Sequence, residues 1–144
     1  MQAFPHRYTA KAFASSDSEI KLESAELPTI ESAPPVEFGG PGNQWSPETL
    51  LVAAVADCFL MTFKAIARAS GFSWESLTCE VEGVLNRVDR VTQFTDFTVH
   101  VLLYVESESN DTTAKRLLHK AEENCLITNS LSANVYLDIH INKI

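Results

Sequence analysis

The chain has 144 residues, with 11 Lys and Arg against 19 Asp and Glu, and a formal net charge of −8 when its four histidines are neutral. A surface this acidic repels phosphate backbones and anionic lipids, so we expect no nucleic-acid partner and no membrane partner. The length suits one ordinary domain, and 45% hydrophobic residues supply a core without disulfide staples. We therefore expect a single domain over residues 1–144.

No segment has the pattern of a signal peptide or a membrane span. The start, MQAFPHRYTA, has no apolar run of signal-peptide length. The longest apolar stretch, residues 51–63, is shorter than the roughly 20 residues that a membrane-spanning helix needs. These features predict a soluble, cytoplasmic protein.

The first 45 residues are polar and contain short strand-like runs. RYTAKAF and EIKLE, separated by the turn-like SSDS, predict a hairpin. The segment APPVEFGGPGNQ is rich in Pro and Gly, which predicts a loop rather than a helix or a central strand.

Helix signals follow together. Ser46 is a good N-cap, Pro47 occupies the first helical position, and Glu48 favours the positive end of the helix dipole. Apolar residues continue through residue 69, and Gly71 is placed to end the helix. We expect a helix over residues 47–70, and its apolar character predicts a position in the middle of the structure.

The second half alternates strands with one more helix. Residues 76–85 and 97–105 alternate apolar and polar side chains, and the polar residues 86–93 between them predict a turn or a strand extension. Asn110 or Asp111 can cap a second helix, and a final strand alternates from residue 134 to residue 142. The sum is an α+β fold: strands, a long helix, a hairpin, a second helix and a closing strand.

The three cysteines are too few and too scattered for a secreted disulfide scaffold or a CxxC metal site. Cys79 lies on the inward face of an alternating strand, where a thiol packs as a small hydrophobe, so we expect no role for it. Cys58 lies among apolar neighbours within the long helix, and Cys125 lies at the turn-like C-terminal end of the second helix. For these two, the pattern leaves packing and reactivity open.

Three segments carry a resemblance to a known family. They are PVEFGGPGNQWSPETLLVAAVADCFLMTF, the VEG at residues 81–83, and AEENCLITNSL at residues 121–131. Their most specific parts are SPE-x-LL, a cysteine ten residues after its glutamate, and a second cysteine ending the later helix. Over nearly its whole length the chain resembles the OsmC/Ohr family, the osmotically inducible protein C and organic hydroperoxide resistance proteins.

The resemblance implies an intertwined homodimer with two central helices flanked by antiparallel sheets. It also implies a cytoplasmic antioxidant enzyme of the stress response that reduces organic hydroperoxides in preference to hydrogen peroxide. Cys58 would attack the peroxide, Cys125 would resolve the sulfenic acid as a disulfide, and Glu48 would be the carboxylate of the site. An external dithiol would then reduce the disulfide, and no cofactor or metal is implied.

Glu48 raises a geometric question. Ten residues of helix separate it from Cys58 by about 15 Å along the axis, so the two cannot touch in one straight helix. Either the helix bends, or the partner chain supplies Glu48 across a two-fold axis, which we favour. The alternative is that Glu48 serves only the N-terminus of the helix.

The sequence departs from the family pattern at an arginine that pairs with this glutamate. The two places where family branches carry it are here ASSDS and VEFGG, which contain none. Without a cation, a thiol among apolar groups forms little thiolate at neutral pH. Arg7, Lys11, Arg87 and Arg90 are the candidate substitutes.

The missing arginine keeps other functions open. One is a non-catalytic protein that binds an apolar small molecule in the apolar pocket of the dimer, where the peroxidase would bind its substrate. Another is a thiol-based redox sensor, although no basic DNA-binding segment supports it. His100 and His140 fall on polar strand faces, which argues against a cysteine hydrolase, and no cluster has metal-ligand spacing.

Overall fold

The computed structural model describes residues 1–144 and divides the chain into two compact units, Met1–Leu50 and Leu51–Ile144. In the first unit, β1 (Lys11–Phe13), β2 (Ile20–Glu23) and β3 (Ile30–Ser32) form an antiparallel sheet in that order. The predicted hairpin is therefore confirmed as β1 and β2. A short 3-10 turn, η1 (Val36–Phe38), lies within the predicted loop.

The long helix α1 (Pro47–Ala69) begins and ends as its sequence predicts. At its start, Ser46 Oγ accepts a hydrogen bond from the Thr49 amide (3.1 Å), and the Ser46 amide donates to Thr49 Oγ1 (2.8 Å). At its end, Gly71 adopts a φ of 65°, and the Phe72 amide donates to the Ala67 carbonyl at 2.9 Å. This left-handed glycine with its backward hydrogen bond is the Schellman arrangement that stops a helix.

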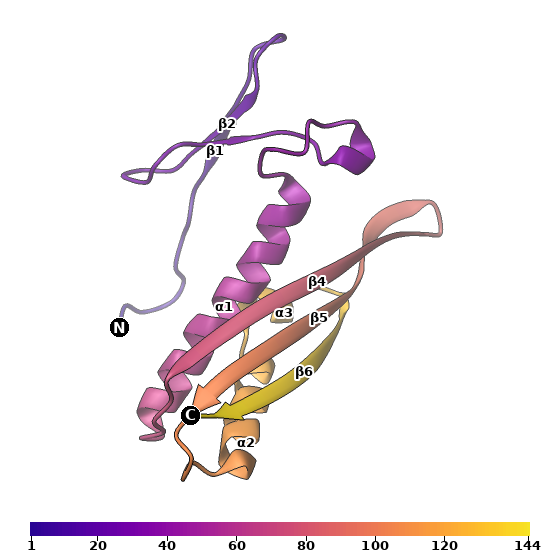
Figure 1. Ribbon diagram of the computed structural model, residues 1–144. Coiled ribbons are helices and arrows are strands. Elements are labelled where there is room, and N and C mark those ends of the chain that lie inside the picture. The colour runs from indigo at the N-terminus through magenta and orange to yellow at the C-terminus, as the bar shows by residue number, and fades with distance from the viewer. The chain divides into compact units, whose positions relative to one another are not determined.

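The second unit contains a sheet of β4 (Ser76–Val88), β5 (Val91–Val105) and β6 (Asn134–Lys143), drawn in Figure 1. β4 and β5 form an antiparallel hairpin that turns at Asp89 and Arg90, whose φ angles are 50° and 69°. Most of the segment predicted as a turn or a strand extension is thus strand. Such positive φ values suit the two-residue turns that match the twist of hairpin strands.

One feature of the expected sheets is wrong, because β6 runs parallel to β5. The connection between them contains α2 (Asp111–Glu123) and the short α3 (Leu126–Asn129). A helical crossover returns the chain to the starting end of β5, so the next strand points in the same direction. The sheet is therefore mixed rather than antiparallel.

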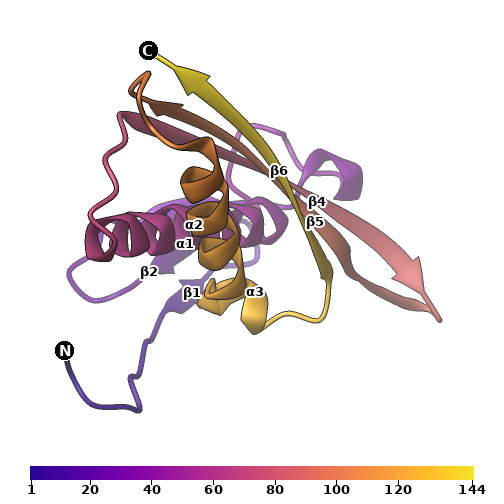
Figure 2. The same ribbon diagram turned by 90° about the horizontal axis from the view of Figure 1, so that it is seen from below.

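Both main helices pack on one face of this sheet (Figures 1 and 2). Asn110 caps α2, as the sequence predicts, by accepting a hydrogen bond from the Thr113 amide at 3.1 Å. The fully buried core draws on α1, β5 and α2: Val55, Phe59, Phe63, Ala67, Phe97, Val99, Val101, Leu103, Val105, Ala114, Leu117, Leu118 and Ala121. Burial of this apolar surface is the main force that holds the unit together.

Candidate functional site

Two thiols that lie far apart in the sequence are neighbours in the second unit. Cys58 belongs to the middle of α1, and Cys125 lies between α2 and α3. Burial raises the pKa of the Cys125 thiol most, and the neighbouring Cys58 thiol raises it further. All cysteines are free thiols in this structure. The fold thus brings together the two cysteines that the sequence singled out.

Cys125, for which the sequence left packing and reactivity open, is buried. Cys125 is only 1% exposed. The helix α2 ends at Glu123, and Cys125 occupies the N-cap position of α3. Burial is the largest influence and raises the pKa of the Cys125 thiol, whereas hydrogen bonds from Thr128 lower it. The net shift is upward, so Cys125 keeps its proton at neutral pH.

Cys58 is half-buried and has a hydroxyl neighbour one turn along α1. Thr62 Oγ1 donates a hydrogen bond to the Cys58 carbonyl at 2.7 Å and lies 4.0 Å from Cys58 Sγ. The hydroxyl proton is already engaged, which leaves the thiol as the donor in the long contact between sulfur and oxygen. None of the ion pairs in the structure includes a residue of α1.

Glu48 lies in the first turn of the same helix. Because α1 is one unbroken helix of 23 residues (Figure 1), ten residues separate Glu48 from Cys58 by about 15 Å along its axis. Glu48 Oε2 is buried and has no hydrogen-bond partner. Leaving a buried carboxylate oxygen without a hydrogen-bond donor costs folding free energy. The single chain supplies no donor for Glu48 Oε2.

Cys79 is half-buried on the inward face of β4, opposite Val101 of β5. Burial raises the pKa of the Cys79 thiol to about 11, and Cys125 contributes further to the rise. Cys79 therefore stays protonated at neutral pH.

The apolar neighbours of Cys58 on α1 lie in different environments. Phe59 and Phe63 are fully buried in the core of the second unit, so they pack rather than face a ligand. Met61 is 61% exposed on another side of α1.

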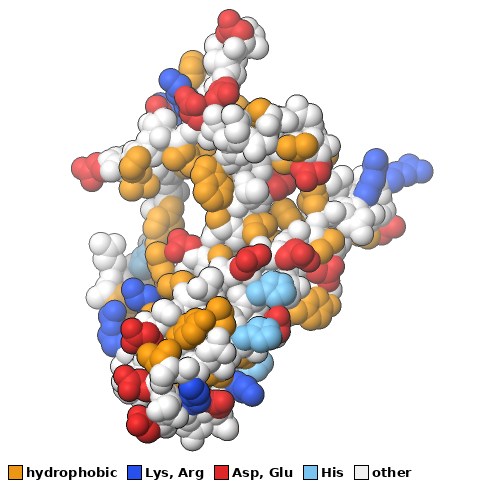
Figure 3. All heavy atoms as spheres, viewed as in Figure 1, with side chains coloured by type: hydrophobic (Ala, Val, Ile, Leu, Met, Phe, Trp, Pro, Cys, Tyr) orange, Lys and Arg blue, Asp and Glu red, His pale blue; other side chains and the backbone are white.

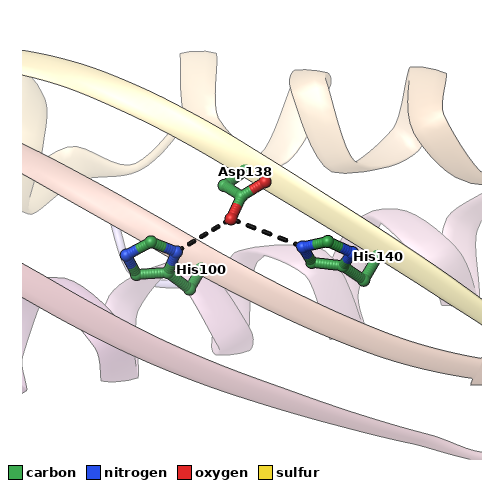
Figure 4. A network of polar contacts seen from close by, with 3 residues as sticks. All are labelled: His100, Asp138 and His140. Carbon is green, nitrogen blue, oxygen red and sulfur yellow. Dashed lines mark hydrogen bonds and ion pairs between the residues drawn. The ribbon is translucent and has the colours of Figure 1, made fainter.

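The outer face of the β4–β6 sheet carries a polar network that sequence reasoning missed (Figures 3 and 4). Asp138 Oδ2 lies 2.9 Å from His100 Nδ1 and 3.5 Å from His140 Nε2. Both histidines are exposed, as their strand patterns predict. The parallel register that sets His100 beside Asp138 has no local sequence signal. No three His, Cys, Asp or Glu side chains are arranged to hold a metal ion.

A small apolar pocket also lies in the second unit and was not foreseen. Its volume is about 210 Å³. It is lined by Leu51, Gln93, Phe94, Phe97, Leu131, Ser132 and Ala133.

These observations define a class of protein: an α+β fold with two main helices, two three-stranded sheets and a pair of adjacent thiols. The chain belongs to the OsmC-like protein family, whose model matches residues 40–140. It is 33% identical over 122 residues to the uncharacterized protein YmaD of Bacillus subtilis, covering 82% of this chain and 80% of YmaD.

Solved structures agree in fold. An OsmC-like protein of unknown function from Vibrio cholerae matches with a TM-score of 0.83 and 20% identity, over 96% of this chain and 100% of that one. An organic hydroperoxide resistance protein OsmC from Legionella pneumophila matches with a TM-score of 0.75 and 24% identity, over 99% of this chain and 100% of that one. The predicted family and α+β class are confirmed. By length and composition alone α1 could span a membrane, but in this fold it is a core helix.

Proposed function

We propose that the protein is a thiol-dependent peroxidase that reduces organic hydroperoxides in the cytoplasm. The observation that carries the proposal is the adjacency of Cys58 and Cys125, which come from different elements of the second unit. Two comparisons support this proposal. The chain belongs to the OsmC-like family, and its fold matches that of an organic hydroperoxide resistance protein.

The reaction balances with these two sulfurs and an external dithiol. The Cys58 thiolate attacks the peroxide oxygen, the O–O bond breaks, and the products are a Cys58 sulfenic acid and, after protonation, an alcohol. The Cys125 thiol then displaces water from the sulfenic acid to form the Cys58–Cys125 disulfide. A dithiol reduces this disulfide by thiol–disulfide exchange and is itself oxidised.

The surroundings of the two thiols suit different roles. Cys125 is buried and holds its proton, which fits a resolving thiol that waits for the sulfenic acid. Cys58 is the more exposed of the two, so a peroxide has better access to it.

A homodimer would complete the site. Only 22% of the most apolar 18-residue window of α1 is buried in the single chain, which leaves apolar helix surface to be covered. Glu48 cannot reach Cys58 of its own helix, and its buried Oε2 lacks a partner. We therefore assign the carboxylate of the site to Glu48 of the partner subunit.

Existing ion pairs reduce the number of candidates for the cation that would favour the Cys58 thiolate. Lys11 is already paired with Glu23 at 2.8 Å. Arg7, Arg87 and Arg90 form no ion pair within the chain, so they remain the candidates.

The decisive experiment is intact mass spectrometry of the reduced protein after one equivalent of cumene hydroperoxide, with hydrogen peroxide in parallel. We expect a rapid loss of two hydrogens per chain with the organic peroxide, and peptide mapping should locate the bond between Cys58 and Cys125. No mass change over minutes would refute the proposal.

Cysteine variants test the roles separately. Cys58→Ser should abolish turnover, whereas Cys125→Ser should let Cys58 advance to sulfinic acid, a gain of two oxygens. Cys79→Ser is the matched control and should keep its activity. Full turnover in Cys58→Ser would contradict the assignment.

A second candidate function is non-catalytic binding of an apolar small molecule. The pocket of about 210 Å³ and the lack of an arginine at the expected positions favour it. It predicts saturable binding that persists when Cys58 and Cys125 are both replaced by serine. Binding that disappears with the thiols would count against it.

A further inference from the structure

The outer side of α2 carries a concentration of positive charge that the thiol chemistry does not use. The side chains of Lys115, Arg116, His119 and Lys120 are all exposed, whereas the inward residues of the same helix are buried. None of the ion pairs in the structure includes these four residues. In a chain with a net charge of −8, residues 115–120 therefore form a local basic surface, which we call the basic face.

The requirements of the helix itself do not explain this charge. Arg116 and Lys120 lie four residues apart on the same side of α2, where like charges repel each other and weaken a helix. The helix dipole favours a cation in the last turn, which accounts for Lys120 but not for Lys115 or Arg116. A partner that supplies negative charge would relieve the repulsion.

Acidic side chains limit the basic face at both ends. Asp111 lies in the first turn of α2, where its Oδ1 is 2.6 Å from Lys143 Nζ, and Glu122 and Glu123 lie at the other end of the helix. Residues 115–120 between them span about 8 Å of helix. This length fits a few carboxylates gathered on a protein or peptide, whereas an extended polyanion such as RNA would also meet the acidic ends. The basic face therefore suits a locally acidic protein.

The basic face lies close to the thiol pair and outside the surface that a second chain would cover. Lys120 precedes Cys125 by five residues, and α2 runs along the outside of the second unit (Figure 2). The outward residues of α2 are polar, unlike the largely uncovered apolar surface of α1 that a homodimer would bury. We therefore expect the basic face to stay accessible in the dimer.

We propose that the basic face docks the protein dithiol that reduces the Cys58–Cys125 disulfide, and that it selects a donor with carboxylates beside its thiols; this inference rests on the peroxidase function proposed above. One thiolate of the donor attacks the sulfur of Cys58, the more accessible cysteine, and forms a mixed disulfide while Cys125 leaves and takes up a proton. The second donor thiol loses its proton and displaces Cys58 as a thiolate. The donor leaves as a disulfide, and both thiols of the site are restored.

Two dithiol peptides and one charge reversal test the docking. Both peptides contain the sequence Cys-Gly-Pro-Cys, flanked by glutamates in one and by glutamines in the other. Diamide first forms the Cys58–Cys125 disulfide without any need for peroxidase activity, and intact mass spectrometry then follows its reduction by each peptide. Arg116→Glu is the test variant, because a carboxylate four residues before Lys120 forms a favourable helical pair and preserves α2. Lys21→Glu, at an exposed position of β2, changes the net charge equally and is the matched control.

At low ionic strength we expect Arg116→Glu to slow reduction by the glutamate peptide about tenfold and to leave reduction by the glutamine peptide unchanged. Salt at about 0.5 M should remove most of this difference, because it screens the attraction between exposed charges. Lys21→Glu should change neither rate by more than about twofold. Equal effects of Arg116→Glu on both peptides, no effect on either, or an effect that Lys21→Glu reproduces would overturn the docking assignment.

The same experiment separates this inference from the peroxidase proposal. If the protein reduces no hydroperoxide but its disulfide shows the expected selectivity, the docking assignment stands and the peroxidase proposal fails. If hydroperoxide turnover with dithiothreitol is normal but the selectivity is absent, only the docking assignment fails. A disulfide that diamide cannot form would refute both. A change in the oligomeric state of Arg116→Glu in analytical ultracentrifugation would show that the basic face contacts a second copy of the chain, and would also overturn the assignment.

Discussion

Replacing Gly83 with alanine would place a methyl group against two aromatic rings. In β4 the new Cβ would meet Phe94 at 2.9 Å, Phe97 at 3.0 Å and Val52 at 3.0 Å. Phe97 is completely buried, and Val52 packs against the core, so neither has free space to move into. Only the half-buried Phe94 can yield, and moving it would disrupt the stacked pair.

Two effects of opposite sign determine how much Gly83→Ala changes the free energy of unfolding. Alanine restricts the unfolded chain more than glycine does, which stabilises the folded state by about 0.5–1 kcal/mol. Overpacking a well-filled core costs about 1–3 kcal/mol. We therefore expect Gly83→Ala to lower the free energy of unfolding by about 1–2 kcal/mol.

Guanidinium unfolding measures this change as a shift of the transition midpoint at constant slope. Glu82→Ala is the matched control, because Glu82 is the adjacent β4 residue and is exposed on the outer face. Its free energy of unfolding should stay within about 0.5 kcal/mol of the unmodified protein. A Gly83→Ala protein that is as stable as the unmodified one, or more stable, would refute the steric argument.

Three further predictions follow from single side chains. Phe63 is fully buried and meets Trp74 edge-on at 5.5 Å, so Phe63→Ala should cost about 3–5 kcal/mol in urea unfolding; a cost below about 1 kcal/mol would contradict its place in the core. The pKa of Cys79 is about 11, so alkylation of Cys79 in the folded protein should accelerate tenfold per pH unit up to that value; a plateau near pH 8 would show a different environment. The hydrogen bond with His100 lowers the pKa of Asp138 in the folded protein. The stability that this hydrogen bond contributes is therefore present above the pKa of Asp138 in the unfolded chain, and it is lost as the pH falls through the pKa of Asp138 in the folded protein. His100→Ala should raise the pKa of Asp138 in a carboxyl NMR titration, and an unchanged value would refute the contact.

The sequence predicts element boundaries well where the determining interactions are local. Ser46, Gly71 and Asn110 each act on backbone groups within a few residues, so the helix ends that they form can be inferred from neighbouring letters. Period-two alternation similarly identifies the inward face of β6. The family resemblance added the two candidate cysteines and Glu48 to this local information.

Tertiary structure decided the features that depend on how distant segments meet. The helical crossover made β6 parallel to β5 and thereby placed Asp138 beside His100. The same crossover buried Cys125 at the junction of α2 and α3 and set it next to Cys58. Periodicity indicates which face of a strand or helix is apolar, but it carries no information on which other face will cover it. Packing of α1 and α2 against one sheet supplied that information for the thiol pair.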